Sequence, residues 1–148
     1  MNITDYEEWR TKYNSLVDAY REESDRAAAI LAGSFLEAFL EAYLRRLLVE
    51  DPEHIDGVFS GFGPLATMAA KVDVLYGLGF VSPVMQRDLR YIRKIRNHFA
   101  HHPEVTAFDS SPVRDLASHL STAKPLERTD GIIEEVESPR DRYLLAIG

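Results

Sequence analysis

Apolar residues recur at spacings of three and four along most of the chain, and no segment alternates apolar and polar residues cleanly. The first spacing marks one face of an α-helix, whereas strict alternation would indicate a half-buried strand. The pattern therefore predicts an all-α fold, a single helical bundle of about five to seven helices in one domain over residues 1–148. Only residues 132–136, within a loop-like stretch, suggest a short extended piece.

Start and stop signals divide this pattern into separate helices. Thr4 and Glu7 form a capping box, and a proline in the first turn recurs at Pro64 and Pro83. Residues 51–57, "DPEHIDG", are interpreted as a stop. The helices are expected at about residues 4–22, 24–50, 63–79, 82–101, 112–121 and from 139 onward. The last one stops abruptly, so either the chain ends inside a packed helix or a longer natural chain was cut there.

Three of the expected helices carry the candidate core. The second is apolar nearly all round, which is typical of a helix buried on most sides. The third has an apolar stripe at Leu65, Met68, Val72 and Leu75, and the fourth has one at Leu89, Ile92, Ile95 and Phe99. These stripes predict three helices packed against one another.

A polar stripe interrupts the second helix at Ser34, Glu37, Glu41 and Arg45. A buried carboxylate needs a cation or several hydrogen-bond donors. The cations best suited by type are Arg93 and Arg96, three residues apart on the fourth helix. We therefore expect a structural ion pair drawn from Glu37, Glu41, Arg93 and Arg96.

Three histidines follow at the end of the fourth helix. His98 and His102 are four residues apart, the spacing at which two histidines on one helical turn share a metal, and His101 lies between them. Zinc needs a further ligand, and Pro103 ends helical geometry beside the last histidine. A solvated or capping role near the helix C-terminus is favoured over a metal site, and no cofactor is expected.

Charge and composition limit the class of function. The net charge is −7, residues 1–60 carrying 13 acids and 6 bases and residues 61–148 carrying 11 of each. A general nucleic-acid binder needs clustered Lys and Arg in excess. The sequence has no cysteine and no helix-turn-helix pattern, its N-terminus is polar rather than signal-like, and no apolar run approaches a membrane span. A cytoplasmic protein without sequence-specific DNA binding or membrane insertion is expected.

Arg96, Asn97 and His101 resemble the signature of HEPN domains, a family of small helical bundles. Many members are metal-independent ribonucleases. The resemblance implies that Arg96 holds the scissile phosphate and His101 moves the proton, with two copies meeting across a dimer. The alternative is that Arg96 pairs with a buried carboxylate while Asn97 and His101 bind backbone at the helix end.

A second resemblance rests on four blocks in order, "DRAAAILAGSFLEAFLEAYLRRLL", "FGPLATMAAKVDVLYGLGFVSP", "IRKIRNHFAHHPEVTAFDS" and "SPRDRYLLAIG". Together they are similar to the mannitol operon repressor family over about residues 24–148. This resemblance implies an all-helical, HEPN-like bacterial regulator of sugar-alcohol uptake and use. Family members lack a DNA-reading helix-turn-helix, which implies action through protein partners. We expect a non-enzymatic regulator of this kind, with a ribonuclease as the alternative and a homodimer left open.

Overall fold

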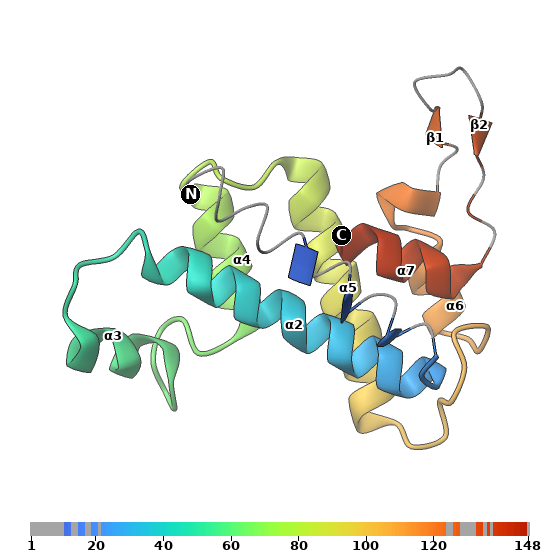
Figure 1. Cartoon of the computed structure of the whole chain (residues 1–148), viewed down its shortest axis with the longest axis horizontal. Helices are drawn as coiled ribbons and strands as arrows, with labels where there is room; N and C mark the ends of the chain where they lie inside the picture. The colour runs from blue at the N-terminus through green and yellow to red at the C-terminus, as the bar shows by residue number, and fades with distance from the viewer. Residues whose placement is uncertain are drawn as a thin grey trace.

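The structure, a computed structural model, describes residues 11–12, 15–16, 19–20, 22–123, 126–127, 133–134, 136 and 138–147. The expected first helix, at about residues 4–22, lies largely outside the described residues. Within them the fold is all-α, which confirms the predicted class. Its helices are α2 (Asp25–Arg45), α3 (Pro52–Phe59), α4 (Met68–Gly77), α5 (Pro83–His101), α6 (Val113–Ala117), the short 3-10 helix η1 (Ser121–Ala123) and α7 (Pro139–Ile147) (Figure 1).

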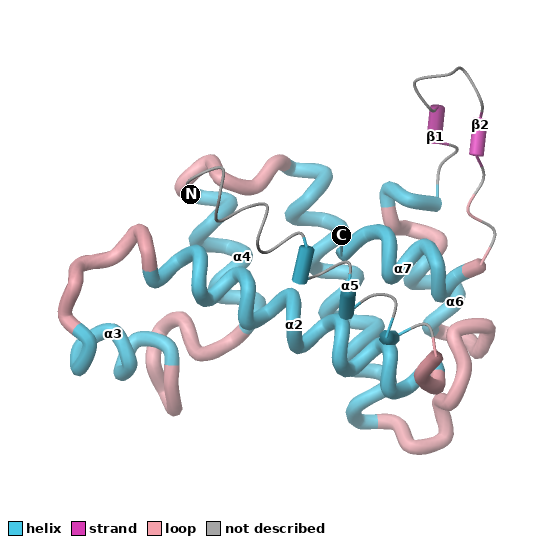
Figure 2. The backbone as a smooth tube through the Cα atoms, in the orientation of Figure 1, coloured by secondary structure: helices cyan, strands magenta, loops and turns pink. Residues whose placement is uncertain are grey.

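Two short strands project from the helical body. The strands β1 (Leu126–Glu127) and β2 (Ile133–Glu134) pair antiparallel, with Leu126 opposite Glu134. Figure 2 shows them extending away from the helices on the side of α7. The extended piece expected near residues 132–136 is thus confirmed for Ile133–Glu134.

The central helix is α2, which packs against α4, α5 and α7. The hydroxyl of Ser24 caps it by accepting from the backbone N–H of Ala27. By length and apolar composition alone α2 could cross a membrane, contrary to the sequence expectation, but core helices meet the same criterion. The small residues Ala28, Ala29, Ala32 and Gly33 are all buried, so neighbouring helices approach this end of α2 closely.

The two predicted apolar stripes face this helix. On α4, Met68, Val72 and Leu75 are buried, and Leu65 is buried in the turn before it. On α5, the whole stripe from Leu89 to Phe99 is buried. Ser82 caps α5, as the sequence predicts, by accepting from the N–H of Met85. The core predicted for these helices is confirmed.

The bounds differ from the prediction in four places. Helix α2 ends at Arg45, five residues before the predicted end at about residue 50. The stretch interpreted as a stop begins a helix, α3, because Asp51 accepts from the N–H of His54 and Pro52 suits a first turn. Helix α4 begins only at Met68, where the Thr67 hydroxyl caps it, and the preceding residues form a turn. Helix α6 is five residues long, shorter than the ten expected.

The last helix is fastened to the first turn of α2. The Arg140 guanidinium donates to Asp25 at 2.6 Å and also to the carbonyls of Tyr20 and Glu23. Asp25 accepts in addition from the N–H of Phe108. The buried Tyr143 hydroxyl donates to the carbonyl of Ala29 at 2.8 Å. These contacts close the bundle between residues 83 to 120 positions apart.

Candidate functional site

An alternating chain of charges runs from α5 across α2 and α4 to α3. Arg96 Nη2 lies 2.6 Å from Glu37 Oε2, and the other oxygen of Glu37 lies 3.3 Å from Lys71 Nζ. Lys71 Nζ lies 3.0 Å from Glu41 Oε2, and Glu41 Oε1 accepts from Arg45 Nε at 3.0 Å. Arg45 is the last cation of this chain of charges, and its Nη1 donates to Asp56 Oδ1 at 2.8 Å. Each carboxylate therefore has at least one cation beside it.

Helical spacing explains why these groups meet. Glu37, Glu41 and Arg45 are four residues apart, so they follow one side of α2. Lys71 comes from α4, and its side chain is 4% exposed, so the two carboxylates that face it offset the cost of burying it. Arg45 also lies over the ring of Phe59, 4.7 Å from its centroid, and thereby holds α3 against the end of α2. The chain of charges thus joins four helices, α5, α2, α4 and α3, by polar contacts.

The environment of Glu41 favours its charged form. Burial alone would raise the pKa of this carboxyl, but hydrogen bonds from Lys71 and Arg45 outweigh burial and lower the pKa below its ordinary value. The same contacts with Asp56 and Glu41 raise the pKa of Arg45. Glu41 is therefore held as an anion at neutral pH.

Of the four residues expected to form an ion pair, the structure brings together Glu37 and Arg96. Glu41 pairs with Lys71 and Arg45 instead of an arginine of α5. Arg93 makes no ion pair with any residue that the structure describes, and its Nε is buried without a hydrogen-bond partner. Lys71 was not among the predicted residues, although its position three residues after Met68 places it beside the apolar stripe of α4.

The chain of charges also explains a glycine in α2. A Cβ atom on Gly33 would lie 2.8 Å from Arg96 Cγ and 2.9 Å from the Tyr143 hydroxyl. Only glycine lets the stem of Arg96 pass α2 at this distance on its way to Glu37. Packing against Gly33 and the ion pair with Glu37 therefore both fix the position of the Arg96 side chain.

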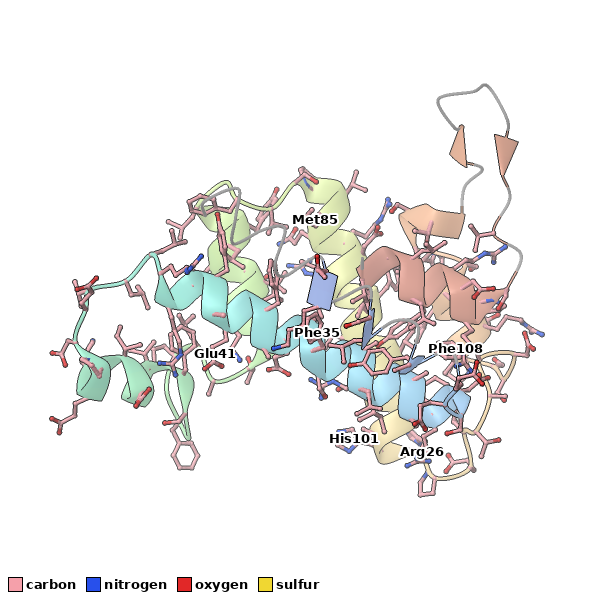
Figure 3. The ribbon with its side chains drawn as sticks, in the orientation of Figure 1. Arg26, Phe35, Glu41, Met85, His101 and Phe108 are labelled. Atoms are coloured by element: carbon pink, nitrogen blue, oxygen red, sulfur yellow. The ribbon has the colours of Figure 1, made fainter. Side chains whose placement is uncertain are left out.

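His101 lies at the other end of α5 from Met85, at the edge of the molecule (Figure 3). The rings of His98 and His102 lie 5.1 Å apart, and His102 Nδ1 lies 3.1 Å from Glu104. The nearby Arg26 donates to the carbonyls of His102 and Pro103. Among the described residues no group of three His, Cys, Asp or Glu side chains is arranged to hold a metal ion, and this includes His98, His101 and His102.

The HEPN-like residues do not converge within the chain. Helix α5 continues through His101, and residues five apart lie about 140° apart around an ideal helix. Arg96 is directed to Glu37, Asn97 is half-buried and His101 is exposed. Within one chain this arrangement places no shared open space between the guanidinium and the imidazole.

A third feature is a set of exposed apolar residues around the turn from α4 to α5. Its side chains are 38–57% exposed and comprise Val74, Tyr76, Leu78, Phe80, Val84 and Met85. We call these six residues the turn surface. The ring of Phe80 contacts Tyr43 of α2 edge-on at 5.5 Å, which connects the turn to the central helix. Figure 3 shows Met85 at the end of α5 opposite His101.

The comparisons with known proteins identify a family for the chain. Residues 22–147 match the family described as MtlR, mannitol repressor. No curated protein and no solved structure matches the chain. The match covers all six α-helices from α2 to α7, including every residue of the charge chain and of the turn surface. The chain therefore belongs to the mannitol repressor family.

Proposed function

We propose that this regulator of the mannitol repressor type acts by binding another protein, rather than by reading DNA or catalysing a reaction. The cytoplasm is the compartment in which we place it. The observation that carries the proposal is the turn surface, where six large apolar side chains are exposed on consecutive elements. Apolar side chains gathered in this way mark protein interaction sites more often than single exposed residues do.

Charge next to the turn surface indicates the kind of partner. Arg87 and Arg90 follow Val84 by three and six residues on α5, and both are exposed. Interfaces commonly combine an apolar centre with a polar, charged rim. A partner with an apolar patch bordered by acidic residues complements this arrangement.

DNA reading is a poor alternative for a molecule of this charge. Neutralising phosphates requires several bases, and the net charge of the chain is −7. We expect the purified protein to bind duplex DNA weakly, without sequence preference and only at low salt.

The test replaces exposed residues of the turn surface in the host. The double variant Leu78→Ser, Met85→Ser removes two side chains that are 57% and 52% exposed. Transcription of the mannitol genes is measured in a deletion strain that carries wild type, this variant or Phe62→Ser. Phe62 is fully exposed in the turn between α3 and α4, so the control removes an apolar side chain elsewhere.

We expect the double variant to lose repression and co-purification of a host protein, while Phe62→Ser keeps both. Circular dichroism and thermal melting establish that both variants fold. Full repression by the double variant would contradict the proposal. A sequence-specific, salt-resistant footprint of the purified protein on the regulated promoter would contradict it as well.

A further inference from the structure

A groove of about 320 Å³ lies between α4 and α5, lined by Ala69, Val72, Asp73, Leu89, Arg90 and Arg93. Its base is apolar, since Val72 and Leu89 are both buried core residues. Of its charged residues, Asp73 of α4 and Arg90 of α5 are more than half exposed, and Arg93 of α5 is half-buried. None of these six residues belongs to the turn surface or to the chain of charges.

The charges of the groove do not cancel. Asp73 accepts from Arg90 at 3.0 Å and from Gln86 at 3.5 Å, so the positive charge of Arg90 is compensated by this carboxylate. Arg93 has no carboxylate partner among the described residues, and its Nε is buried without a hydrogen bond. A buried donor left unsatisfied is costly and uncommon in folded proteins. The groove therefore carries one excess positive charge, that of Arg93.

We propose that this groove binds a small organic anion. Its carboxylate or phosphate group pairs with Arg93, whose planar guanidinium suits both kinds of oxyanion. Its apolar part lies on Val72 and Leu89. The volume is at the lower end of the range for ligand sites, which limits the ligand to a small molecule. The proposal holds whether or not the turn surface binds a protein.

The direct measurement is the NMR signal of the Arg93 side-chain N–H. The probes are inorganic phosphate, a phosphate monoester with a short alkyl chain, and butyrate, each titrated at constant ionic strength against sodium chloride. We expect the signal of Arg93 to shift and saturate at millimolar concentrations of the monoester or of butyrate, and not with chloride. The probe that saturates first identifies the anionic group that the groove prefers.

A matched pair of variants locates the site. Arg93→Gln removes the unpaired charge, and Lys94→Gln removes one positive charge from the exposed side of the same helix. Binding, followed by calorimetry, should weaken about tenfold or more in Arg93→Gln and less than about twofold in Lys94→Gln. If Arg93→Gln does not fold, Arg93→Lys, which keeps the charge but loses the planar fork, is expected to weaken binding too.

Three outcomes would overturn the proposal. The first is that no organic anion produces a saturating shift. The second is that Arg93→Gln, folded as judged by its melting curve, binds as tightly as the wild type. The third is an equal loss in Lys94→Gln, since that would indicate attraction to the general charge of α5 and not a site in the groove.

Discussion

Lys71 is the least exposed charged residue that the structure describes, and it stands at the middle of the chain of charges. It is 3% exposed, and two carboxylates of α2 lie within 3.3 Å of its ammonium group. Removing it would leave Glu37 and Glu41 facing each other, each with one arginine. The cost of breaking such a buried pair lies mainly in the charges that remain without compensation.

We expect Lys71→Ala to lower the free energy of unfolding by about 2–4 kcal/mol. Urea unfolding measures the change. Lys94→Ala is the control, because Lys94 is exposed and its loss should change stability by no more than about 0.5 kcal/mol. Equal stability of the two variants would mean that the buried ammonium contributes nothing to the fold.

Glu41 should make part of the stability depend on pH. Its pKa is lowered in the folded protein, so its contribution is complete above the unfolded-state value of about 4.3 and is lost as the pH falls through the folded value. The difference in unfolding free energy between wild type and Glu41→Gln should be constant above about pH 5 and shrink below about pH 4. Glu50→Gln, at an exposed carboxylate, is the control. Parallel curves for wild type and Glu41→Gln down to pH 3 would contradict the prediction.

At the scale of elements, three helices meet at Gly33 of α2. Arg96 of α5 and Tyr143 of α7 both lie within 3 Å of the position that a Cβ atom would take. Overpacking of this kind forces side chains off their rotamers or helices apart. The spacing of α2, α5 and α7 therefore depends on one missing methyl group.

Gly33→Ala should destabilise the protein by about 1–3 kcal/mol despite the better helix propensity of alanine. Gly77→Ala is the matched control, because a Cβ atom there has nothing within 4 Å. That variant should be neutral or more stable by up to about 1 kcal/mol. Thermal and urea unfolding distinguish the two, and a stabilised Gly33→Ala would show that the helices separate without cost.

Periodicity predicted those elements whose positions depend on a single apolar face. Leu89, Ile92, Ile95 and Phe99 could be placed in the core because a helix with one apolar stripe packs in only one orientation. Helix α3 could not be predicted in this way, since a proline such as Pro52 occurs both just after one helix and in the first turn of the next. The partner of Glu41 was also not predictable, because helical spacing restricts contacts within α2 but not the rotation of α4 against it.

At the scale of the molecule, the arrangement of Arg96 and His101 bears on catalysis. A general acid or base must reach the group that it protonates, and the phosphate-binding cation must reach the same substrate. The guanidinium of Arg96 is directed inward to Glu37, 2.6 Å away, and His101 is exposed at the end of α5. A phosphate would have to displace a carboxylate from Arg96 before it met the imidazole.

We therefore expect the purified protein to leave single-stranded RNA intact, with or without added metal. Gel analysis of a labelled oligonucleotide measures this, and His101→Ala, which folds normally if the residue is only solvated, should behave identically. Cleavage by the wild type that disappears in His101→Ala would favour the ribonuclease alternative over a regulator.

The contact between Asp25 and Arg140 has a consequence for synthesis of the protein. The two residues are 115 positions apart, so at about 5–20 residues per second the ribosome makes the second about 6–23 s after the first. During that interval the buried face of α2 around Ala29 and Gly33 has no α7 to cover it. The newly made chain must therefore remain soluble while this face of α2 is exposed to solvent. The face is buried only when α7 has been made and packs against it.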